Sequence, residues 1–328
     1  MKKLRTAIVG CGNIAQVHEK VLEELDNCEI TACVDIVPEK AALLAGKCGA
    51  RAYFDMLGML AAERPDVVHL CTPHALHVPQ ALTAAEAGAA VFMEKPAATD
   101  RGQWAQLREK ARTVPIGICF QNRWNPNVRK AEELLAEGRL GKILGVRGFL
   151  TWRRDAAYYR DGWHGRWETE GGGTLINQAI HTLDLMIRFL GKPEEVRAVM
   201  ANHHLAGETE VEDTVCLYLT SENRRGLLYA TGAGYRDDPV ILEIGTEKGS
   251  LRLEDTSLEI RTAEGTERMD FTEDVRLGKS YWGAGHRRCI SSFYEALSRG
   301  EPVPNDPESC ADTMETVLAA YEQCRGRF

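Results

Sequence analysis

A short glycine-containing turn between an apolar strand and a helical pattern is the feature that most restricts how this chain can fold. Residues 7–9 are apolar, Gly10 and Gly12 follow them, and a helical pattern begins within three residues. Gly10 permits a tight turn, Gly12 lets the backbone approach a ligand closely, and Ala15 is small enough for the helix to touch the strand. The free amides at the start of the helix, with the positive end of its dipole, favour phosphate groups. The turn therefore predicts a dinucleotide site.

An acidic residue at the end of the next strand supports this interpretation. Asp35 closes the apolar stretch 30–34, twenty residues after Ala15, where a carboxylate can accept hydrogen bonds from the ribose hydroxyls of a dinucleotide. Such a carboxylate repels a 2′-phosphate, and no arginine follows it in residues 36–38. We therefore predict NAD as the cofactor and disfavour NADP. The contacts predicted here are Gly10, Gly12, Asn13, Ile14 and Asp35.

Length and composition limit the class of protein and its partners. A chain of 328 residues predicts two domains. Its 44% hydrophobic and 27% charged residues are typical of a globular protein. The net charge of −8 argues against a nucleic-acid partner, because phosphate backbones bind basic surfaces. No apolar stretch reaches the roughly 20 residues of a membrane helix, so no membrane partner is expected.

The ten cysteines are scattered and form no C-x-x-C pair. We interpret them as reduced, mostly buried thiols of a cytoplasmic protein. Cys71, His74 and His77 are spaced like metal ligands. They span the end of a predicted strand and lack a second ligand cluster, so no metal is predicted.

The first part of the chain, residues 1–122, is predicted to be an α/β domain. Its strands are expected at 4–9, 29–34, 66–70, 89–93 and 115–119, and its helices at 13–25, 38–46, 55–63, 76–87 and 100–112. Short, continuously apolar strands indicate burial on both faces, and hence a doubly wound parallel sheet covered by helices. Ligands of such sheets bind beyond the carboxyl ends of the strands. Loops at two of these ends carry the predicted cofactor contacts Thr72, His77, Glu94 and Lys95.

Residues 123–328 show a different pattern, which predicts an α+β domain with a mainly antiparallel sheet. Helices are expected at 126–137, 284–299 and 307–325, and strands at 143–153, 196–204, 211–220, 225–234, 239–245, 250–253 and 257–262. We assign this domain to substrate binding and oligomerisation.

A polar stripe on an otherwise apolar helix is the most informative feature of the second half. Asn177, His181, Asp184 and Arg188 fall within about 60° of one another on a helix. A helix this apolar around the rest of its circumference is buried, so we predict that the stripe lines an internal cleft. The preceding residues 171–173 are all glycine and allow a close backbone approach. A satisfied buried pair of His181 and Asp184 is the alternative, which the dinucleotide site in the same chain disfavours.

Lys95 follows a predicted strand at the expected cofactor edge, between Glu94 and Pro96. An ordinary lysine there would simply be solvated. Near a positively charged nicotinamide the pKa of this lysine should fall, which makes it a better proton acceptor. Oxidation of an alcohol needs such a base, and both Lys95 and His181 are candidates.

Four segments together resemble the Gfo/Idh/MocA family of NAD(P)-dependent oxidoreductases: residues 10–15, 71–73, 94–96 and 171–184. The resemblance covers essentially the whole chain. It implies a Rossmann domain followed by a domain with an open, largely antiparallel sheet. It also implies an enzyme that oxidises or reduces carbon–oxygen centres of sugars, sugar derivatives or cyclic polyols, and a homodimer or homotetramer assembled through the open sheet.

The resemblance also implies roles for single residues. Lys95 corresponds to the family's catalytic lysine and His181 to its acid/base histidine. Asn177 stands where inositol-dehydrogenase-like members carry aspartate; it cannot take a proton, but it can hydrogen-bond a substrate hydroxyl. Trp163 and His164 resemble a Trp-Arg pair at the nicotinamide end of some relatives. We further expect cofactor contacts from Gln121 and Trp163, substrate contacts from Lys95, Arg123, Tyr159, Asn177 and His181, and an orienting role for Asp184.

Our hypothesis is therefore an NAD-dependent sugar or polyol dehydrogenase with Lys95, His181, Asn177 and Asp184 as its catalytic group. Two alternatives remain open. One is a non-catalytic NAD-sensing regulatory protein. The other is an NAD-using glycoside-cleaving enzyme that oxidises C3 of the sugar transiently.

Overall fold

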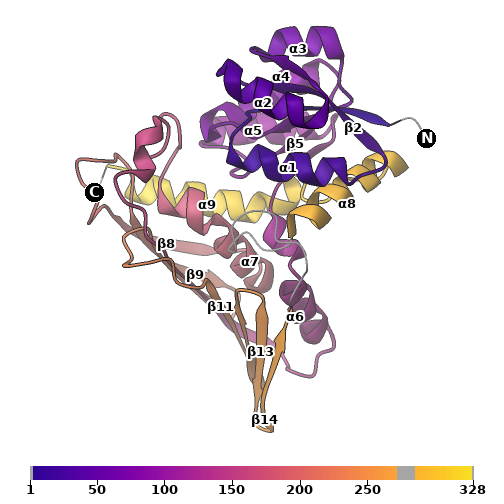
Figure 1. The fold of residues 1–328 in the computed structure, drawn as a ribbon. Coiled ribbons are helices and arrows are strands. Elements are labelled where there is room, and N and C mark those ends of the chain that lie inside the picture. Colours follow the sequence, from indigo (N-terminus) through magenta and orange to yellow (C-terminus); the bar gives the residue numbers. More distant parts are fainter. Residues whose placement is uncertain (1–2, 272–284, 327–328) are drawn as a thin grey trace. The chain divides into compact units, whose positions relative to one another are not determined.

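The computed structural model describes residues 3–271 and 285–326, which form two compact units (Figure 1). Residues 1–121 and 286–310 belong to the first unit, and residues 122–285 and 311–328 to the second. This grouping differs from the single division expected between residues 122 and 123, because residues 286–310 return to the first unit.

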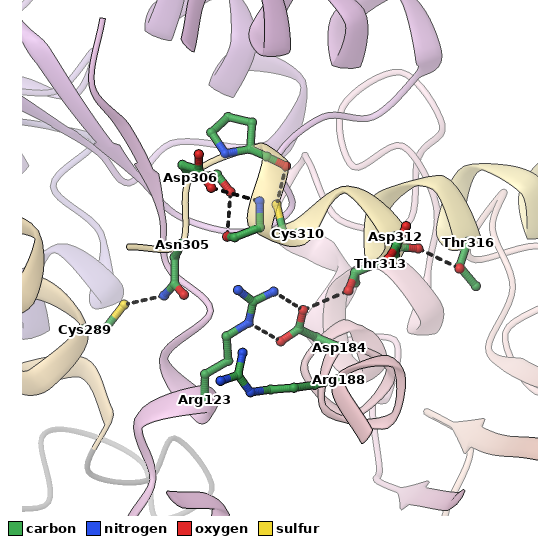
Figure 2. Close-up of polar contacts among 12 residues, drawn as sticks. Arg123, Asp184, Arg188, Cys289, Asn305, Asp306, Cys310, Asp312, Thr313 and Thr316 are labelled. Atoms are coloured by element: carbon green, nitrogen blue, oxygen red, sulfur yellow. Dashed lines mark hydrogen bonds and ion pairs between the residues drawn. The ribbon is translucent and has the colours of Figure 1, made fainter. Parts of the chain in front are cut away.

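Helix α8 (Gly285–Arg299) belongs to the first unit from residue 286 onward because its aromatic face packs on that unit's sheet. Phe293 and Tyr294 are fully buried there, and the Tyr294 hydroxyl lies 2.9 Å from Thr6 Oγ1. Further along, the carbonyl of Asn305 accepts the Ile118 N–H at 2.9 Å. The Asn305 side chain donates to Cys289 Sγ at 3.2 Å (Figure 2). The amphipathic sequence predicts this helix but not the sheet that it covers.

The first unit contains a sheet of six parallel strands, which confirms the predicted doubly wound α/β fold. In sheet order these are β3 (Arg51–Tyr53), β2 (Cys28–Val34), β1 (Leu4–Val9), β4 (Val67–Leu70), β5 (Ala90–Met93) and β6 (Ile116–Ile118). The helices between them are α1 (Asn13–Glu23), α2 (Pro38–Cys48), α3 (Met56–Glu63), α4 (His77–Glu86) and α5 (Arg101–Ala111). The sequence did not predict β3, which is only three residues long.

The second unit contains an eight-stranded sheet in which β7 and β10 pair in parallel and the other neighbours are antiparallel. In sheet order these are β14 (Gly265–Asp270), β13 (Ser257–Thr262), β12 (Gly249–Glu254), β11 (Ile241–Thr246), β7 (Ile143–Thr151), β10 (Arg224–Thr231), β9 (Thr214–Ser221) and β8 (Glu195–Ala201). Its helices are α6 (Pro126–Ala136), α7 (Ile180–Leu190) and α9 (Ala311–Cys324). The sequence did not predict β14, whose polar side chains lack a buried face.

One face of this sheet is covered and the other is largely open. On β9, Val215 and Leu217 are fully buried, whereas Tyr218 between Leu217 and Leu219 is 40% exposed. Helix α7 packs so closely on β7 that a Cβ on Gly148 would lie 2.5 Å from Met186 Sδ. No helix in the described part of the chain combines the length and apolarity needed to cross a membrane.

Two helices of the second unit differ from the prediction. The segment that carries Asn177 is a π-helical turn, Leu175–Ala179, which continues into α7 at Ile180. The last helix begins at Ala311 rather than at residue 307, because a separate 3₁₀ turn occupies Glu308–Cys310. The predicted start at residue 284 for the helix before it lies outside the described residues.

The buried carboxyl of Glu212 anchors the chain just before α7. It accepts the N–H groups of Gly173 and Leu175 at 3.0 and 2.9 Å and the Tyr321 hydroxyl at 2.8 Å. A Cβ at Gly173 would lie 2.0 Å from the Glu212 carbonyl, and one at Gly172 would lie 2.2 Å from the Tyr321 hydroxyl. The close approach predicted for the triple glycine is therefore made to the protein's own chain.

A second anchor joins α7 to α9 and to the start of the second unit. The Arg123 guanidinium donates to both oxygens of Asp184, at 2.7 and 2.6 Å, and Thr313 of α9 donates to the same carboxylate at 2.8 Å (Figure 2). The side chains of Arg123 and Asp184 are only 8% and 2% exposed. This is a buried, bidentate ion pair.

Glu212 should make stability depend on pH. Burial raises its pKa from 4.5 to about 7, although hydrogen bonds from Leu175, Tyr321 and Gly173 oppose the shift. Between these two values the folded state binds the proton that the unfolded state releases. The free energy of unfolding should therefore fall as the pH rises from 4.5 to about 7, by about 3 kcal/mol. In urea titrations across this range, Glu212→Gln should remove that fall; equal slopes in both proteins would contradict the assignment.

Asp184→Asn should strongly destabilise the protein, because it leaves the buried Arg123 guanidinium without its counter-charge. We expect the free energy of unfolding to drop by roughly 3–5 kcal/mol in urea unfolding. The matched double variant Arg123→Met with Asp184→Leu should recover much of this loss, because it buries no uncompensated charge. A single variant as stable as the wild type would show that the pair is not desolvated.

Candidate active site

The turn after β1 lies where the sheet order of the first unit reverses, between β1 and β4. Gly10 has a φ of +87°, and a Cβ there would lie 2.6 Å from the Cys71 carbonyl oxygen, so only glycine fits. Helix α1 begins after Gly12 without a side-chain cap, and a Cβ on Gly12 would meet no protein atom within 4 Å. The first amides of α1 are thus left for an anionic ligand, as a dinucleotide site requires.

Asp35 is tied to this turn. One oxygen of its carboxylate accepts the N–H of Cys11, inside the turn, at 2.8 Å, and the other accepts the Val37 N–H at 2.8 Å. A carboxylate has about four acceptor positions, so two amide contacts leave capacity for ribose hydroxyls. The adjacent Ile36 is 89% exposed and offers an apolar surface beside this position. Asn13 and Ile14 form the first turn of α1, where Asn13 is exposed and Ile14 half-buried.

His77 joins the loops that follow β4 and β5. Its ring nitrogens lie 2.8 Å from the Pro96 carbonyl and 2.9 Å from the Thr72 carbonyl. Burial lowers its pKa, although both carbonyls oppose this. The Thr72 hydroxyl donates to Gln80 at 2.6 Å. Because both ring nitrogens face backbone oxygens, the structure gives His77 a role in shaping these loops, and its direct cofactor contact stays a prediction.

A buried polar chain ends on Glu94, next to Lys95. The Glu94 carboxylate lies 3.1 Å from Nε2 of His18, and the Nδ1 atoms of His18 and His69 are 2.8 Å apart. His69 Nε2 in turn lies 2.9 Å from the Tyr294 hydroxyl. Burial lowers the pKa of His69 well below its ordinary value, so this ring is neutral and has one N–H. With Tyr294 donating to His69, every donor in the chain points towards Glu94.

This arrangement keeps Glu94 ionised. Burial alone would raise its pKa, but the hydrogen bond from His18 and the nearby charge of Lys95 hold the pKa below its usual range. Lys95, at the end of this segment, is half-buried.

His18, Glu94 and Cys119 offer ligand atoms within 4.8 Å of one another, a group that the sequence analysis did not consider. The hydrogen bond between His18 and Glu94 accounts for the proximity of these two residues. Gln121, 3% exposed, lies beyond Cys119, whose thiol faces its side-chain oxygen at 3.9 Å.

In the second unit, Asn177 belongs to a network that the sequence did not reveal. Its amide nitrogen donates to Glu170 at 2.6 Å and to the Tyr158 hydroxyl at 3.2 Å. Glu170, 1% exposed, also accepts the Gly165 N–H at 2.5 Å, and Tyr158 lies 3.0 Å from His164 Nε2. Glu170 directly precedes the triple glycine, which was the only signal in the sequence that could have identified it.

Trp163 and Tyr159 lie in the loop around this network. The Trp163 ring is 3.6 Å from that of His164, centroid to centroid, and His164 is oriented by Asp161 at 2.6 Å. Tyr159 packs against Tyr158 with ring centroids 5.0 Å apart, and burial raises its pKa, so the hydroxyl keeps its proton. These contacts fix the rings; the cofactor role of Trp163 and the substrate role of Tyr159 stay predictions.

The four residues of the polar stripe differ in burial and in partners. Asn177 and His181 are half-buried, Asp184 is buried against Arg123, and Arg188 is exposed and pairs with Glu132. The π-helical turn before Ile180 also shifts Asn177 out of the regular helical repeat that relates the other three positions. Asp184 and Arg123 therefore anchor the helix, and their catalytic and substrate roles stay predictions.

Comparison with known proteins agrees with this architecture. A family model described as an oxidoreductase family with an NAD-binding Rossmann fold matches residues 4–115, and the Gfo/Idh/MocA C-terminal domain model matches residues 128–252. Among solved structures, the chain is similar to the WlbA dehydrogenase from Bordetella pertussis in complex with NADH and UDP-GlcNAcA. The TM-score is 0.86 at 27% identity, over 100% of this chain and 98% of that one.

Two relatives illustrate the range of the similarity. D-glucoside 3-dehydrogenase of Escherichia coli (strain K12) is 34% identical over 209 residues, which are 61% of this chain and 57% of that protein. Inositol 2-dehydrogenase of Rhizobium meliloti (strain 1021) is 25% identical over 311 residues, 92% of this chain and 90% of that protein. The matches in both halves of the sequence and the agreement in fold place the chain in the Gfo/Idh/MocA family of oxidoreductases, whose first domain has an NAD-binding Rossmann fold.

Proposed function

We propose that this protein is an NAD-dependent dehydrogenase that transfers a hydride between nicotinamide and a secondary hydroxyl or ketone of a sugar, sugar derivative or cyclic polyol. The observation that carries the proposal is the turn at Gly10 and Gly12, with its uncapped helix and with Asp35 held beside it. The names of the relatives, which include a glucoside and an inositol dehydrogenase, support the substrate class.

The residues of the first unit fit the cofactor. Gly10, Gly12, Asn13 and Ile14 would hold its phosphates at the start of α1, and Asp35 would hold a ribose and disfavour NADP. The nicotinamide end would be held by Thr72, His77, Glu94, Lys95, Gln121 and Trp163. When bound, NAD supplies C4 of the nicotinamide as the hydride acceptor.

The chain's own residues supply the proton chemistry. We assign the removal of the hydroxyl proton to Lys95 or His181. Glu94, kept ionised by the hydrogen bond from His18, places a negative charge next to Lys95. Asn177, its amide nitrogen fixed by Glu170 and Tyr158, is assigned to a substrate hydroxyl. Asp184 supports these residues by anchoring α7.

We also propose a homodimer or homotetramer formed through the open face of the eight-stranded sheet. Val199, Tyr218 and Tyr229 are 70%, 40% and 38% exposed on that face, which is unusual for large apolar side chains of neighbouring strands. None of the ten cysteines, all within the described residues, forms a disulfide, which favours a reducing compartment, and we place the protein in the cytoplasm.

Lys95→Ala and His181→Ala should each lower turnover, by roughly 100- to 10,000-fold for the residue that acts as the base. The assay is NADH absorbance with a panel of pyranosides and inositols. Fluorescence titration with NADH should show cofactor binding close to that of the wild type in His181→Ala. Lys248→Ala, an exposed lysine in the turn between β11 and β12, is the matched control and should keep full activity. Undiminished rates in both active-site variants would refute the assignment.

The same assay separates the alternatives. A non-catalytic sensor would bind NADH but form none with any sugar. A glycoside-cleaving enzyme would release free sugar without accumulating NADH. Steady accumulation of NADH that matches the oxidised sugar supports the dehydrogenase.

A further inference from the structure

The second unit contains a cleft of 670 Å³ lined by three arginines, two tyrosines and two aspartates. The cleft is largely open to solvent, and its volume lies within the roughly 300–1,000 Å³ of small-molecule sites. Arg153 and Arg154 come from the loop after β7, and Tyr235 and Arg236 from the loop after β10. Except for Tyr158, which holds Asn177, its residues have no part in the function proposed above.

The topology of the sheet builds this cleft. β7 and β10 are parallel neighbours, so the loops after them leave the same edge of the sheet. Backbone hydrogen bonds join the two loops, from Arg154 N–H to the Gly232 carbonyl at 2.7 Å and from Gly234 N–H to the Trp152 carbonyl at 2.8 Å. Both loops therefore border the same end of the sheet.

The three arginines differ in how their charges are compensated. Arg154, with its side chain 9% exposed, packs over the Trp152 ring and donates to Asp237 at 3.0 Å. Arg236 is exposed and pairs with Asp238. Arg153 is exposed, and the hydrogen bond of its guanidinium goes to the Tyr235 carbonyl at 3.5 Å. No carboxylate of the described residues forms an ion pair with Arg153, so its positive charge is available to a ligand.

The two aspartates of the cleft are engaged by the protein's own donors. Asp155 accepts the N–H groups of Ala157 and Tyr158 at 3.1 and 3.3 Å. Asp237 accepts the Arg153 N–H at 2.8 Å in addition to the Arg154 guanidinium. Arginines thus outnumber aspartates in this cleft, although the whole chain carries a net charge of −8.

Tyr158 connects the cleft to the candidate catalytic segment. Its ring lies under the Arg154 guanidinium, 5.4 Å away, and its hydroxyl accepts the Asn177 amide at 3.2 Å. A ligand that contacts Asn177 through a hydroxyl can therefore extend past Tyr158 towards the arginines. Tyr235, 89% exposed, adds an aromatic face at the rim.

We propose that this cleft binds an anionic group, a carboxylate or a phosphate, on the same molecule whose hydroxyl is oxidised. The inference rests on the proposed dehydrogenase function and narrows its substrate class to acidic or phosphorylated sugars. A guanidinium binds either group through paired, charge-assisted hydrogen bonds. The cleft is too large for the anionic group alone and leaves room for the part of the molecule that carries it.

The test compares three sugars in the NADH assay: methyl β-D-glucoside, methyl β-D-glucuronide and UDP-glucose. We expect kcat/KM to be higher for at least one charged sugar than for the neutral one. Arg153→Gln should lower the ratio of kcat/KM for the charged sugar to kcat/KM for the neutral sugar roughly 10-fold, since a hydrogen-bonded charge is removed. Asp237→Asn should raise it, because Arg154 loses its carboxylate partner. The matched control Arg268→Gln, on β14 and paired with Asp270, should leave the ratio unchanged.

The outcomes identify the anionic group. A preference for the glucuronide that Arg153→Gln abolishes assigns a carboxylate, and the same result with UDP-glucose assigns a phosphate. Added salt should reduce either preference. Equal kcat/KM values for all three sugars, or a ratio that Arg153→Gln leaves unchanged, would overturn the inference while the dehydrogenase function stands.

Calorimetric titration of the NADH-loaded protein with the same three sugars separates the two proposals. If no sugar yields NADH, the proposed function fails. Binding of a charged sugar that weakens in Arg153→Gln then still supports the cleft. If neither charged sugar binds more tightly than the neutral one, the cleft is not an anion site.

Discussion

The buried carboxyl of Glu212 holds in place the segment on which the candidate chemistry of the second unit depends. It accepts hydrogen bonds from the buried amides of Gly173 and Leu175, just before and at the start of the π-helical turn, and from the Tyr321 hydroxyl of the last helix. The glycines at 172 and 173 are needed because their neighbours leave no space for a side chain. The backbone that leads into Asn177 and His181 is therefore held in place by hydrogen bonds as well as by apolar packing.

The same principle operates in the first unit, where a buried anion is compensated by a line of donors. Glu94 is kept ionised by His18, which is itself held by His69 and Tyr294. The cost of burying a carboxylate is offset only when such donors converge on it. A defined negative charge is thereby placed next to Lys95.

Charge compensation also differs between the arginines of the second unit. Arg123 and Asp184 are residue types that often act in catalysis or binding. Here they form two hydrogen bonds with each other and anchor α7. Arg153, in contrast, is an unremarkable loop arginine in the sequence, yet it has no carboxylate partner among the described residues and faces a cleft. Which polar groups remain available is decided by the neighbours that folding brings to them.

The sequence by itself determined the alternation of strands and helices, the parallel sheet, the turn at Gly10 and Gly12 and the family. These follow from local periodicity and from residues within one turn, where the physical cause lies a few positions away. It missed β3 and β14, the π-helical turn and the network of Tyr158, Glu170 and Asn177. It also could not reveal that α8 joins the first sheet. Only the tertiary structure decided these features, because each depends on a partner elsewhere in the fold, such as Asp184 for Arg123 or Tyr321 for Glu212. No pattern along the chain encodes that pairing.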